Sequence, residues 1–353
     1  MVRNKLTLLP CLMSLILMSA SCGGKNESRR ETTTEGETRV VAETPFSSDS
    51  AYAAVARQVA FGPRVPGSEA HKRCAAFLSA ELTRHGLDVI EQPMTLTAYD
   101  GTRLECVNII GRYRPEASER ILLFAHWDTR PYADAESDPA KWRTPIDGAN
   151  DGGSGVGVLL EIGRLLQTKG LREGLGVDII FFDAEDYGVP QFAEYDGDTE
   201  KTWGLGAQYW AKNPHTPDSR ADLGILLDMV GGEGAAFYRE YFSQESAGRA
   251  VTEVWQTAHD LGHGSYFHNA VGGGLVDDHV FVIRHRRIPC LDIVDYDPAR
   301  ATGFPATWHT MDDTMEHISR ETLQAVGSTV WTCLLYTSPS PRDRSLSRMP
   351  SSA

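Results

Sequence analysis

Six short segments of this sequence combine carboxylate and imidazole side chains with apolar or glycine-rich surroundings. They are AHWDT (125–129), GANDGGSGV (148–156), FFDAEDYG (181–188), LLDMVGG (226–232), VDDHVF (276–281) and FPATWHTMDD (304–313). Any one of them has an ordinary structural explanation, such as a helix cap, a solvated acidic loop or a buried structural histidine. The six segments together are hard to explain without a functional site that uses them. Because they offer oxygen and nitrogen ligands and no sulfur, they predict a catalytic zinc with one coordination position open.

Two of these segments illustrate how the chain could present metal ligands. His126 and Asp128 stand two residues apart after an apolar run, so in extended chain their side chains point to the same side. One such pair alone is more often structural than functional. Asp151 lies in a glycine-rich turn, where its simpler role would be to cap the following helix. The density of glycine exceeds what a cap needs and lets the backbone pass close to a ligand.

The segment 181–188 places three carboxylates within four residues, directly after an apolar run. Such crowding is costly without a counter-charge, and a divalent cation would offset the repulsion. Adjacent acids also suit a division of labour in which Asp186 binds the metal while Glu185 stays free as a base. The alternative is an ordinary solvated loop.

The elements that must position these residues form an α/β pattern. Nearly continuous apolar runs at 121–126, 177–182, 223–230 and 288–294 predict strands that are covered on both faces. A helical pattern at 155–169 would cross over between the first two, which gives a mostly parallel sheet. Residues 87–96 and 104–113 alternate enough to pair as strands, and Ser68 can cap a helix that ends near His85.

One domain over residues 48–331 follows, with a mixed, mostly parallel central sheet and helices on both of its faces. In open sheets of this kind, ligands bind beyond the carboxyl ends of the strands. The acidic and histidine residues that interrupt the apolar runs stand at those ends, so the predicted fold gathers them at one edge of the sheet.

In this order, the six segments resemble the zinc aminopeptidase clan and, within it, the zinc-dependent glutaminyl-peptide cyclotransferases, particularly the bacterial ones. The resemblance covers roughly residues 48–331. In the aminopeptidases, the corresponding residues hold two zinc ions. His126 and Asp228 would then bind one ion, Asp186 and His309 the other, and Asp151 would bridge them. Cyclases of this fold bind one zinc per chain, and the resemblance implies Asp151, Asp186 and His309 as its ligands.

The segment FPATWHTMDD favours the cyclase, because it looks like the cyclase segment that carries the zinc histidine and an aromatic wall. Phe304 and Trp308 would line a small pocket. Asp228 and Asp277 match a hydrogen-bonded acid pair that relays protons and leaves little room for a second metal. The sequence departs from the animal cyclases in two ways. They carry Glu where Asp186 stands, and their pocket tryptophan has no counterpart at 187–192, although Trp203 lies farther on.

The resemblance implies a reaction on peptides and proteins that begin with glutamine. Zinc would polarise the γ-carboxamide and Glu185 would take a proton from the α-amine, which then attacks the amide carbon. Asp228, sharing a proton with Asp277, would stabilise the leaving nitrogen, so that pyroglutamate forms and ammonia leaves. The alternatives are a co-catalytic aminopeptidase with two zinc ions and a non-catalytic lipoprotein that uses the same fold for binding.

The composition makes a nucleic-acid partner unexpected, since 34 basic against 48 acidic residues give a net charge of −14 without a basic stripe. Residues 1–21 read as a lipoprotein-type signal peptide, with Arg3 and Lys5 before an apolar run that is too short to span a bilayer. We therefore expect an exported protein on the periplasmic side, whose membrane contact is a lipid anchor on Cys22.

Residues 22–47 would form a flexible tether, because they are polar and lack periodicity. Cys74, Cys106, Cys290 and Cys333 form no CxxC pair, and we expect buried thiols rather than a disulfide framework or thiolate zinc site. Residues 332–353 become rich in Ser, Pro and Arg, so we expect an unstructured tail that is not native to this domain.

Overall fold

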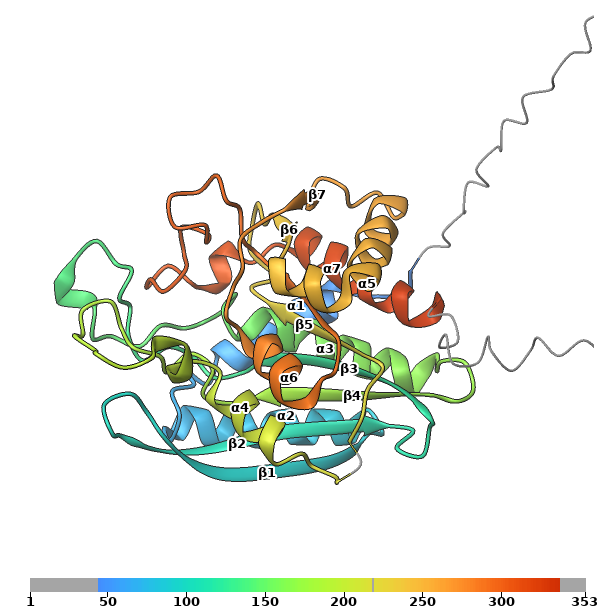
Figure 1. Ribbon diagram of the computed structural model, residues 1–353, viewed down its shortest axis with the longest axis horizontal. Helices are drawn as coiled ribbons and strands as arrows, with labels where there is room; N and C mark the ends of the chain where they lie inside the picture. The colour runs from blue at the N-terminus through green and yellow to red at the C-terminus, as the bar shows by residue number, and fades with distance from the viewer. Residues whose placement is uncertain (1–43, 218, 337–353) are drawn as a thin grey trace, which may run out of the picture. The chain divides into compact units, whose positions relative to one another are not determined.

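In the computed structural model, residues 44–217 and 219–336 are described. Their main sheet has the strand order β1-β2-β4-β3-β5-β8 (Figure 1). The outer hairpin is antiparallel and also pairs antiparallel with β4, while β4, β3, β5 and β8 run parallel to one another. The strands are β1 (Asp88–Thr97), β2 (Arg103–Tyr113), β3 (Glu119–His126), β4 (Leu175–Phe182), β5 (Leu223–Asp228) and β8 (Cys290–Val294). The mixed, mostly parallel sheet predicted from the apolar runs is confirmed.

Helices cover both faces of the sheet, as predicted. Alternate residues of β3 belong to different cores: Leu123 belongs to the core that includes residues of α1, α2, α3, α5 and α7, whereas Phe124 belongs to the core that includes residues of α4 and α6. The helices are α1 (Ser48–Val59), α2 (Glu69–Arg84), α3 (Gly153–Thr168), α4 (Leu205–Lys212), α5 (Tyr241–Asp260), α6 (Asp278–Arg286) and α7 (Arg320–Tyr336). Two short strands, β6 (Phe237–Arg239) and β7 (Phe267–Val271), pair beside the main sheet. Three short 3₁₀ helices also occur: η1 (Pro139–Lys141), η2 (Thr199–Thr202) and η3 (Met315–His317).

Local signals set several boundaries correctly. The Ser68 side chain accepts a hydrogen bond from the backbone N–H of His71 at 3.1 Å, which caps α2 where the sequence predicted it. The crossover helix α3 follows Gly152, whose φ of 84° lies in the left-handed region that favours glycine. An added Cβ there would collide with the carbonyl oxygen of Asp128. The glycine-rich turn therefore allows two site segments to approach each other.

Two predicted boundaries are wrong. Helix α7 continues to Tyr336, and both Trp331 and Leu334 are buried, so the predicted tail cannot begin at residue 332. The sequence after the helix is rich in Ser, Pro and Arg, and this composition hid the last turns of the helix. At the other end, the Phe46 ring is buried against Gly327, so the flexible tether cannot extend to residue 47. One aromatic residue in a polar stretch was enough to attach the chain to the core.

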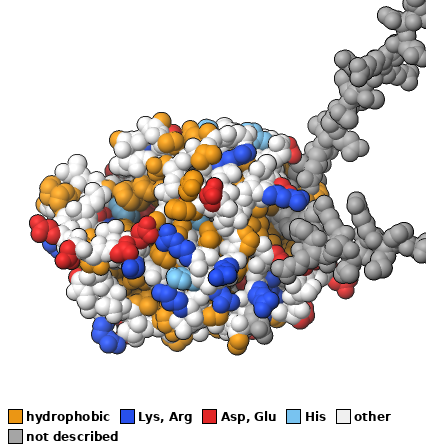
Figure 2. All heavy atoms as spheres, viewed as in Figure 1, with side chains coloured by type: hydrophobic (Ala, Val, Ile, Leu, Met, Phe, Trp, Pro, Cys, Tyr) orange, Lys and Arg blue, Asp and Glu red, His pale blue; other side chains and the backbone are white. Residues whose placement is uncertain are grey.

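The predicted signal peptide, Cys22 and most of the predicted tether lie outside the described residues, as do residues 337–353. Within the described part, no helix is long and apolar enough to cross a membrane. Figure 2 shows Asp and Glu side chains at the left of the molecule, where loops following β3 and β4 lie in Figure 1. Cys74, Cys106 and Cys290 are buried free thiols, as expected, whereas Cys333 is only partly buried.

Candidate metal centre and active site

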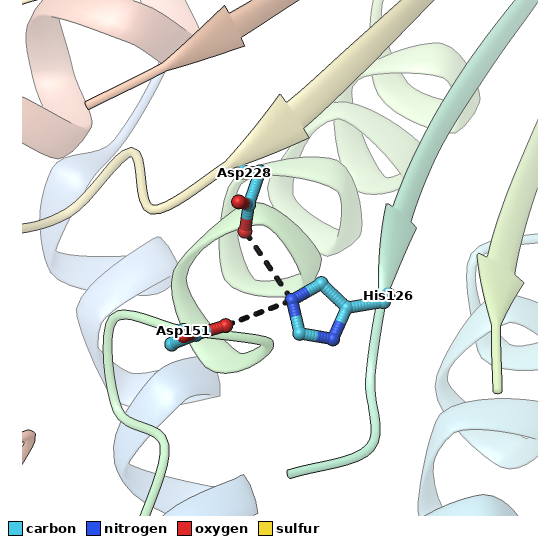
Figure 3. Close-up of side chains that lie close together, drawn as sticks. All are labelled: His126, Asp151 and Asp228. Atoms are coloured by element: carbon cyan, nitrogen blue, oxygen red, sulfur yellow. Dashed lines mark hydrogen bonds and ion pairs between the residues drawn. The ribbon is translucent and has the colours of Figure 1, made fainter. Parts of the chain in front are cut away.

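The carboxyl ends of the parallel strands bring a histidine and two aspartates together. His126 ends β3, Asp228 ends β5, and Asp151 stands in the turn before α3. Nε2 of His126 lies 3.0 Å from Oδ1 of Asp151 and 3.2 Å from Oδ1 of Asp228 (Figure 3). All three side chains are buried. The ends of β3 and β5 and the turn before α3 therefore bring together three of the predicted site residues.

A second group shares Asp151 and adds Asp186 and His309. Nε2 of His309 lies 3.2 Å from Oδ1 of Asp186 and 3.7 Å from Oδ2 of Asp151. In each of the two groups, the potential ligand atoms lie within 4.8 Å of one another. Asp151 thus occupies the bridging place that the sequence comparison implied. The three residues predicted to bind a single zinc are together and buried.

The chemistry of these residues fits a zinc ion. Oδ2 of Asp186 is buried and has no hydrogen-bond partner, which is costly for a carboxylate in a protein interior. Burial, together with the neighbouring charge of Asp151, raises the pKa of Asp186 above its ordinary value. A cation between these groups would satisfy the free oxygen and offset the repulsion. Carboxylate and imidazole ligands without sulfur are typical of catalytic zinc sites.

Backbone contacts from Asp128 hold the segment that carries the two adjacent acids. This buried carboxylate accepts the backbone N–H groups of Glu185 at 3.0 Å and Asp186 at 3.2 Å. Ala184, just before them, has a φ of 53°, an uncommon conformation for a residue with a Cβ. Asp128 is therefore a supporting residue rather than a metal ligand, and it also lies 3.4 Å from Nδ1 of His126.

Asp313 supports the other side of the centre in the same way. Its buried carboxylate accepts the backbone N–H groups of Asn150 at 2.7 Å and Asp151 at 3.0 Å. Burial and the charge of Asp151 raise the pKa of Asp313 to about 7. Sequence reasoning quoted this residue within FPATWHTMDD but gave it no role. The signal was present in the segment, but its partner lies more than 160 residues away.

A pocket of about 320 Å³ opens beside the metal groups and contains the predicted catalytic residues. Its lining includes Glu185, Asp228 and Asp277. Burial raises the pKa of Glu185 well above its ordinary value, and the charges of Asp277 and Asp186 add to this effect. Burial and then the charge of Asp228 raise the pKa of Asp277 to about 7. Among the described contacts, no hydrogen bond joins Asp228 and Asp277. They interact through charge, since Asp228 raises the pKa of Asp277.

Aromatic rings line the same pocket. Phe304 and Trp308 stack with ring centroids 4.5 Å apart, as expected for a wall. Trp203, whose place the sequence left open, also lines the pocket and lies nearly parallel to the His309 ring with centroids 6.1 Å apart. The loop between β4 and α4 brings this residue back to the site. The structure thus supplies a pocket tryptophan although residues 187–192 contain none.

Sequence reasoning missed a buried ion pair beside the metal groups. Arg130 and Asp134 follow β3, only a few residues beyond the segment AHWDT. Nothing in their local sequence distinguishes them from an ordinary surface pair four residues apart. Their contacts with ligand residues become visible only in the folded chain.

Comparison with known proteins agrees with this geometry. Residues 108–334 match the family Peptidase_M28, described as peptidase family M28. Glutaminyl-peptide cyclotransferase of Bos taurus is 28% identical over 243 residues, an alignment that covers 61% of this chain and 62% of the bovine protein. The match therefore spans about three fifths of that relative's length.

Two solved bacterial structures are similar over most of the chain. The Tannerella forsythia glutaminyl cyclase is 57% identical with a TM-score of 0.79, covering 82% of this chain and 99% of that one. A Zn-dependent exopeptidase from Parabacteroides distasonis is also 57% identical, with a TM-score of 0.80 and coverage of 82% and 98%. The fold is thus that of zinc exopeptidase-like proteins.

Proposed function

This chain belongs to peptidase family M28, and we propose that within the family it is a zinc-dependent glutaminyl-peptide cyclotransferase. It would convert the N-terminal glutamine of peptides and proteins to pyroglutamate with release of ammonia. One observation carries the proposal: a single pocket contains the residues of a metal group, a separate carboxylate at Glu185 and an aromatic wall. The similarity to the Tannerella forsythia glutaminyl cyclase supports the same reaction.

We assign one zinc per chain to Asp151, Asp186 and His309. When bound, zinc would supply a Lewis acid that polarises the γ-carboxamide of the substrate. The count of one follows the resemblance to the glutaminyl cyclases. His126, Asp151 and Asp228 form a second group of possible ligands, so metal analysis decides between one zinc ion and two.

The remaining residues of the pocket perform the proton transfers. Glu185 accepts a proton from the α-amine of the substrate, and burial, which raises its pKa, makes its carboxylate a stronger base. The amine nitrogen then attacks the amide carbon and closes the five-membered ring. Asp228 raises the pKa of Asp277, and at least one of these two carboxyl groups keeps a proton, because two neighbouring buried carboxylates do not both ionise cheaply. This protonated carboxyl group stabilises the amide nitrogen as it leaves. Glu185 passes the proton that it took from the α-amine to the same nitrogen, which departs as ammonia.

The aromatic rings orient the substrate. The stacked rings of Phe304 and Trp308 form one side of the pocket, and Trp203 forms another part of its lining. A volume of about 320 Å³ suits one side chain rather than a long peptide segment. The pocket therefore takes the N-terminal glutamine, while the rest of the peptide extends outward.

The decisive experiment combines an ammonia assay with metal analysis. Purified protein is incubated with a dipeptide that begins with glutamine, and ammonia and zinc content are measured. Glu185→Gln should lower turnover on the order of 10²- to 10⁴-fold while zinc content survives. Glu253→Gln, on the exposed surface of α5, is the matched control and should leave turnover unchanged. Loss of zinc in Glu185→Gln would instead make Glu185 a ligand.

A co-catalytic aminopeptidase is the second candidate function, because the two metal groups share Asp151 as a bridge. Two tightly bound zinc ions and release of a free N-terminal residue would replace the cyclase assignment. Protein that binds no metal and releases no ammonia would favour a non-catalytic binding protein.

We further propose that the protein is exported and held by a lipid on Cys22, on the strength of the signal-like segment and small residues before it. Labelling cells with a radioactive fatty acid should mark the wild-type chain but not Cys22→Ala. Equal labelling of the two, or none of either, would contradict this anchor.

A further inference from the structure

A buried ion pair next to the metal groups has no role in the reaction described above. Nε and Nη2 of Arg130 donate to Oδ1 and Oδ2 of Asp134, each at 2.7 Å. Both side chains are almost fully buried, with exposed fractions of 1% and 0%. A bidentate pair of this kind has fixed geometry, because the planar guanidinium matches both carboxylate oxygens. We call it the Arg130–Asp134 clamp.

The arginine side of the clamp contacts Asp186. Nη1 of Arg130 donates to the backbone carbonyl of Asp186 at 3.0 Å and lies 3.4 Å from its Oδ1. It therefore holds both the main chain and the carboxylate of this proposed ligand. The Arg130 guanidinium lies 4.8 Å from the centroid of the Trp203 ring, and Trp203, unlike Arg130, lines the pocket.

The aspartate side of the clamp contacts His309. Oδ1 of Asp134 lies 3.4 Å from Nδ1 of His309, and the next residue, Ala135, donates its backbone N–H to the His309 carbonyl at 3.1 Å. Nε2, the other ring nitrogen, faces Asp151 and Asp186. The two nitrogens therefore face different partners: one faces the proposed metal position, and the other faces the clamp.

The backbone of His309 requires such support. Its φ of 54° lies in the left-handed region, which residues with a Cβ rarely adopt and which persists only where surrounding contacts hold it. In metal sites, a carboxylate behind the ligating imidazole fixes both the ring orientation and the tautomer. Nδ1 of His309 is buried and has no hydrogen-bond partner, and Oδ1 of Asp134, 3.4 Å away, is the carboxylate oxygen placed to take that role.

We propose that the Arg130–Asp134 clamp is a positioning device that sets the orientation of two metal ligands, Asp186 and His309, and so strengthens zinc binding. Neither residue touches the substrate. The inference rests on the zinc ligands proposed above but not on the reaction, so it holds equally for a cyclase and for an aminopeptidase.

A second buried Arg–Asp pair in the same sheet offers a matched control. Nη1 of Arg120 donates to Oδ1 of Asp178 at 2.8 Å, and the side chains are 9% and 6% exposed. This pair lies toward the amino ends of β3 and β4, whereas the clamp follows the carboxyl end of β3. Substitutions in the two pairs remove similar buried charges, but only one pair contacts proposed ligands.

The test measures zinc affinity of the full chain by competition with a chromogenic chelator, together with the melting temperature of the metal-free protein. Asp134→Asn should raise the zinc dissociation constant about 10- to 100-fold. Arg130→Lys should weaken zinc binding less, because it keeps the charge but loses the bidentate geometry. Asp178→Asn should lower the melting temperature while leaving zinc affinity within about threefold.

A double variant guards against loss of folding after one charge of the pair is removed. Arg130→Met combined with Asp134→Leu replaces the pair by apolar residues of similar size, which buried pairs often tolerate. This variant should fold and bind zinc weakly. Wild-type zinc affinity in either Asp134→Asn or the double variant would overturn the proposal and leave the pair a purely structural one. A wild-type protein that binds no zinc would instead overturn the proposed ligands.

Discussion

Substituting Asp128 by asparagine separates support of the active site from catalysis itself. Asp128 accepts the backbone N–H groups of Glu185 and Asp186 with its two carboxylate oxygens, at 3.0 and 3.2 Å. The proposed base and a proposed metal ligand thus depend on one buried side chain. Asparagine preserves its shape but offers one acceptor oxygen, and its NH₂ group would face the N–H of a neighbour.

The expected magnitude follows from these two hydrogen bonds. A buried N–H left without an acceptor costs about 1 to 3 kcal/mol, and the remaining bond loses its assistance by the carboxylate charge. Together we expect a loss of about 2 to 4 kcal/mol in the free energy of unfolding, or roughly 5 to 10 °C in melting temperature. Displacing Glu185 and Asp186 should also lower kcat on the order of 10²-fold, because proton transfer and attack need aligned atoms.

The assay compares Asp128→Asn with Asp295→Asn in thermal melting, ammonia release and zinc affinity. Asp295 is a buried carboxylate that accepts the backbone N–H of Ala236 at 3.0 Å, and its hydrogen-bond partners lie outside the pocket lining. Both variants should lose stability, but only Asp128→Asn should lose activity and zinc affinity. Wild-type kcat and zinc affinity in a destabilised Asp128→Asn protein would refute the supporting role.

Three further predictions concern the pocket, the proton balance and the end of the domain. Trp203→Ala should lower kcat/KM roughly 10- to 100-fold, because apolar contact area is lost, while Trp203→Phe should keep most of the activity. Equal kcat/KM values for the two variants would contradict the place of Trp203 in the pocket. In metal-free protein, burial and then the charge of Asp228 raise the pKa of Asp277 from its ordinary value of 3.8 to about 7, so the folded state keeps a proton that the unfolded state releases. The free energy of unfolding should then fall as pH rises from about 4 to 7, and Asp277→Asn should reduce that slope by up to about 1.4 kcal/mol per pH unit, measured by urea unfolding. A chain ending at Val330 should melt well below one ending at Tyr336, because it lacks the buried Trp331 and Leu334; equal melting temperatures would show that these side chains contribute little.

Much of the site could be predicted from the sequence because its residues follow strands. Apolar runs identify buried parallel strands, and the carboxyl ends of such strands meet at one edge of the sheet. The sequence alone therefore places four residues near one another: His126, Asp228, Glu185 and Asp186. The resemblance of the last segment then pointed to His309. These inferences needed only the direction of each strand and the position where it ends.

The supporting residues could not be predicted in this way, because their partners are remote in the sequence and lie in loops. Asp313 and Asn150 are 163 residues apart, and no local pattern links them. Trp203 reaches the pocket only through the path of the loop after β4, which depends on packing rather than on periodicity. The ends of the domain were misjudged for a related reason, since a single Phe46 ring buried in the core outweighs the polar composition around it.

The sequence by itself determined the architecture, the identity of the ligand-bearing segments and the class of chemistry, because strand periodicity and residue type are local properties. The tertiary structure alone decided which carboxylates support the site and which face the metal. Asp128, Asp134 and Asp313 became supporting residues because their oxygens contact backbone N–H groups, an arginine or the outer nitrogen of a histidine. Asp151 and Asp186 direct oxygens toward Nε2 of His309, and Oδ2 of Asp186 has no hydrogen-bond partner, so a cation fits there. Identical side chains thus acquired different roles from contacts that only the folded chain creates.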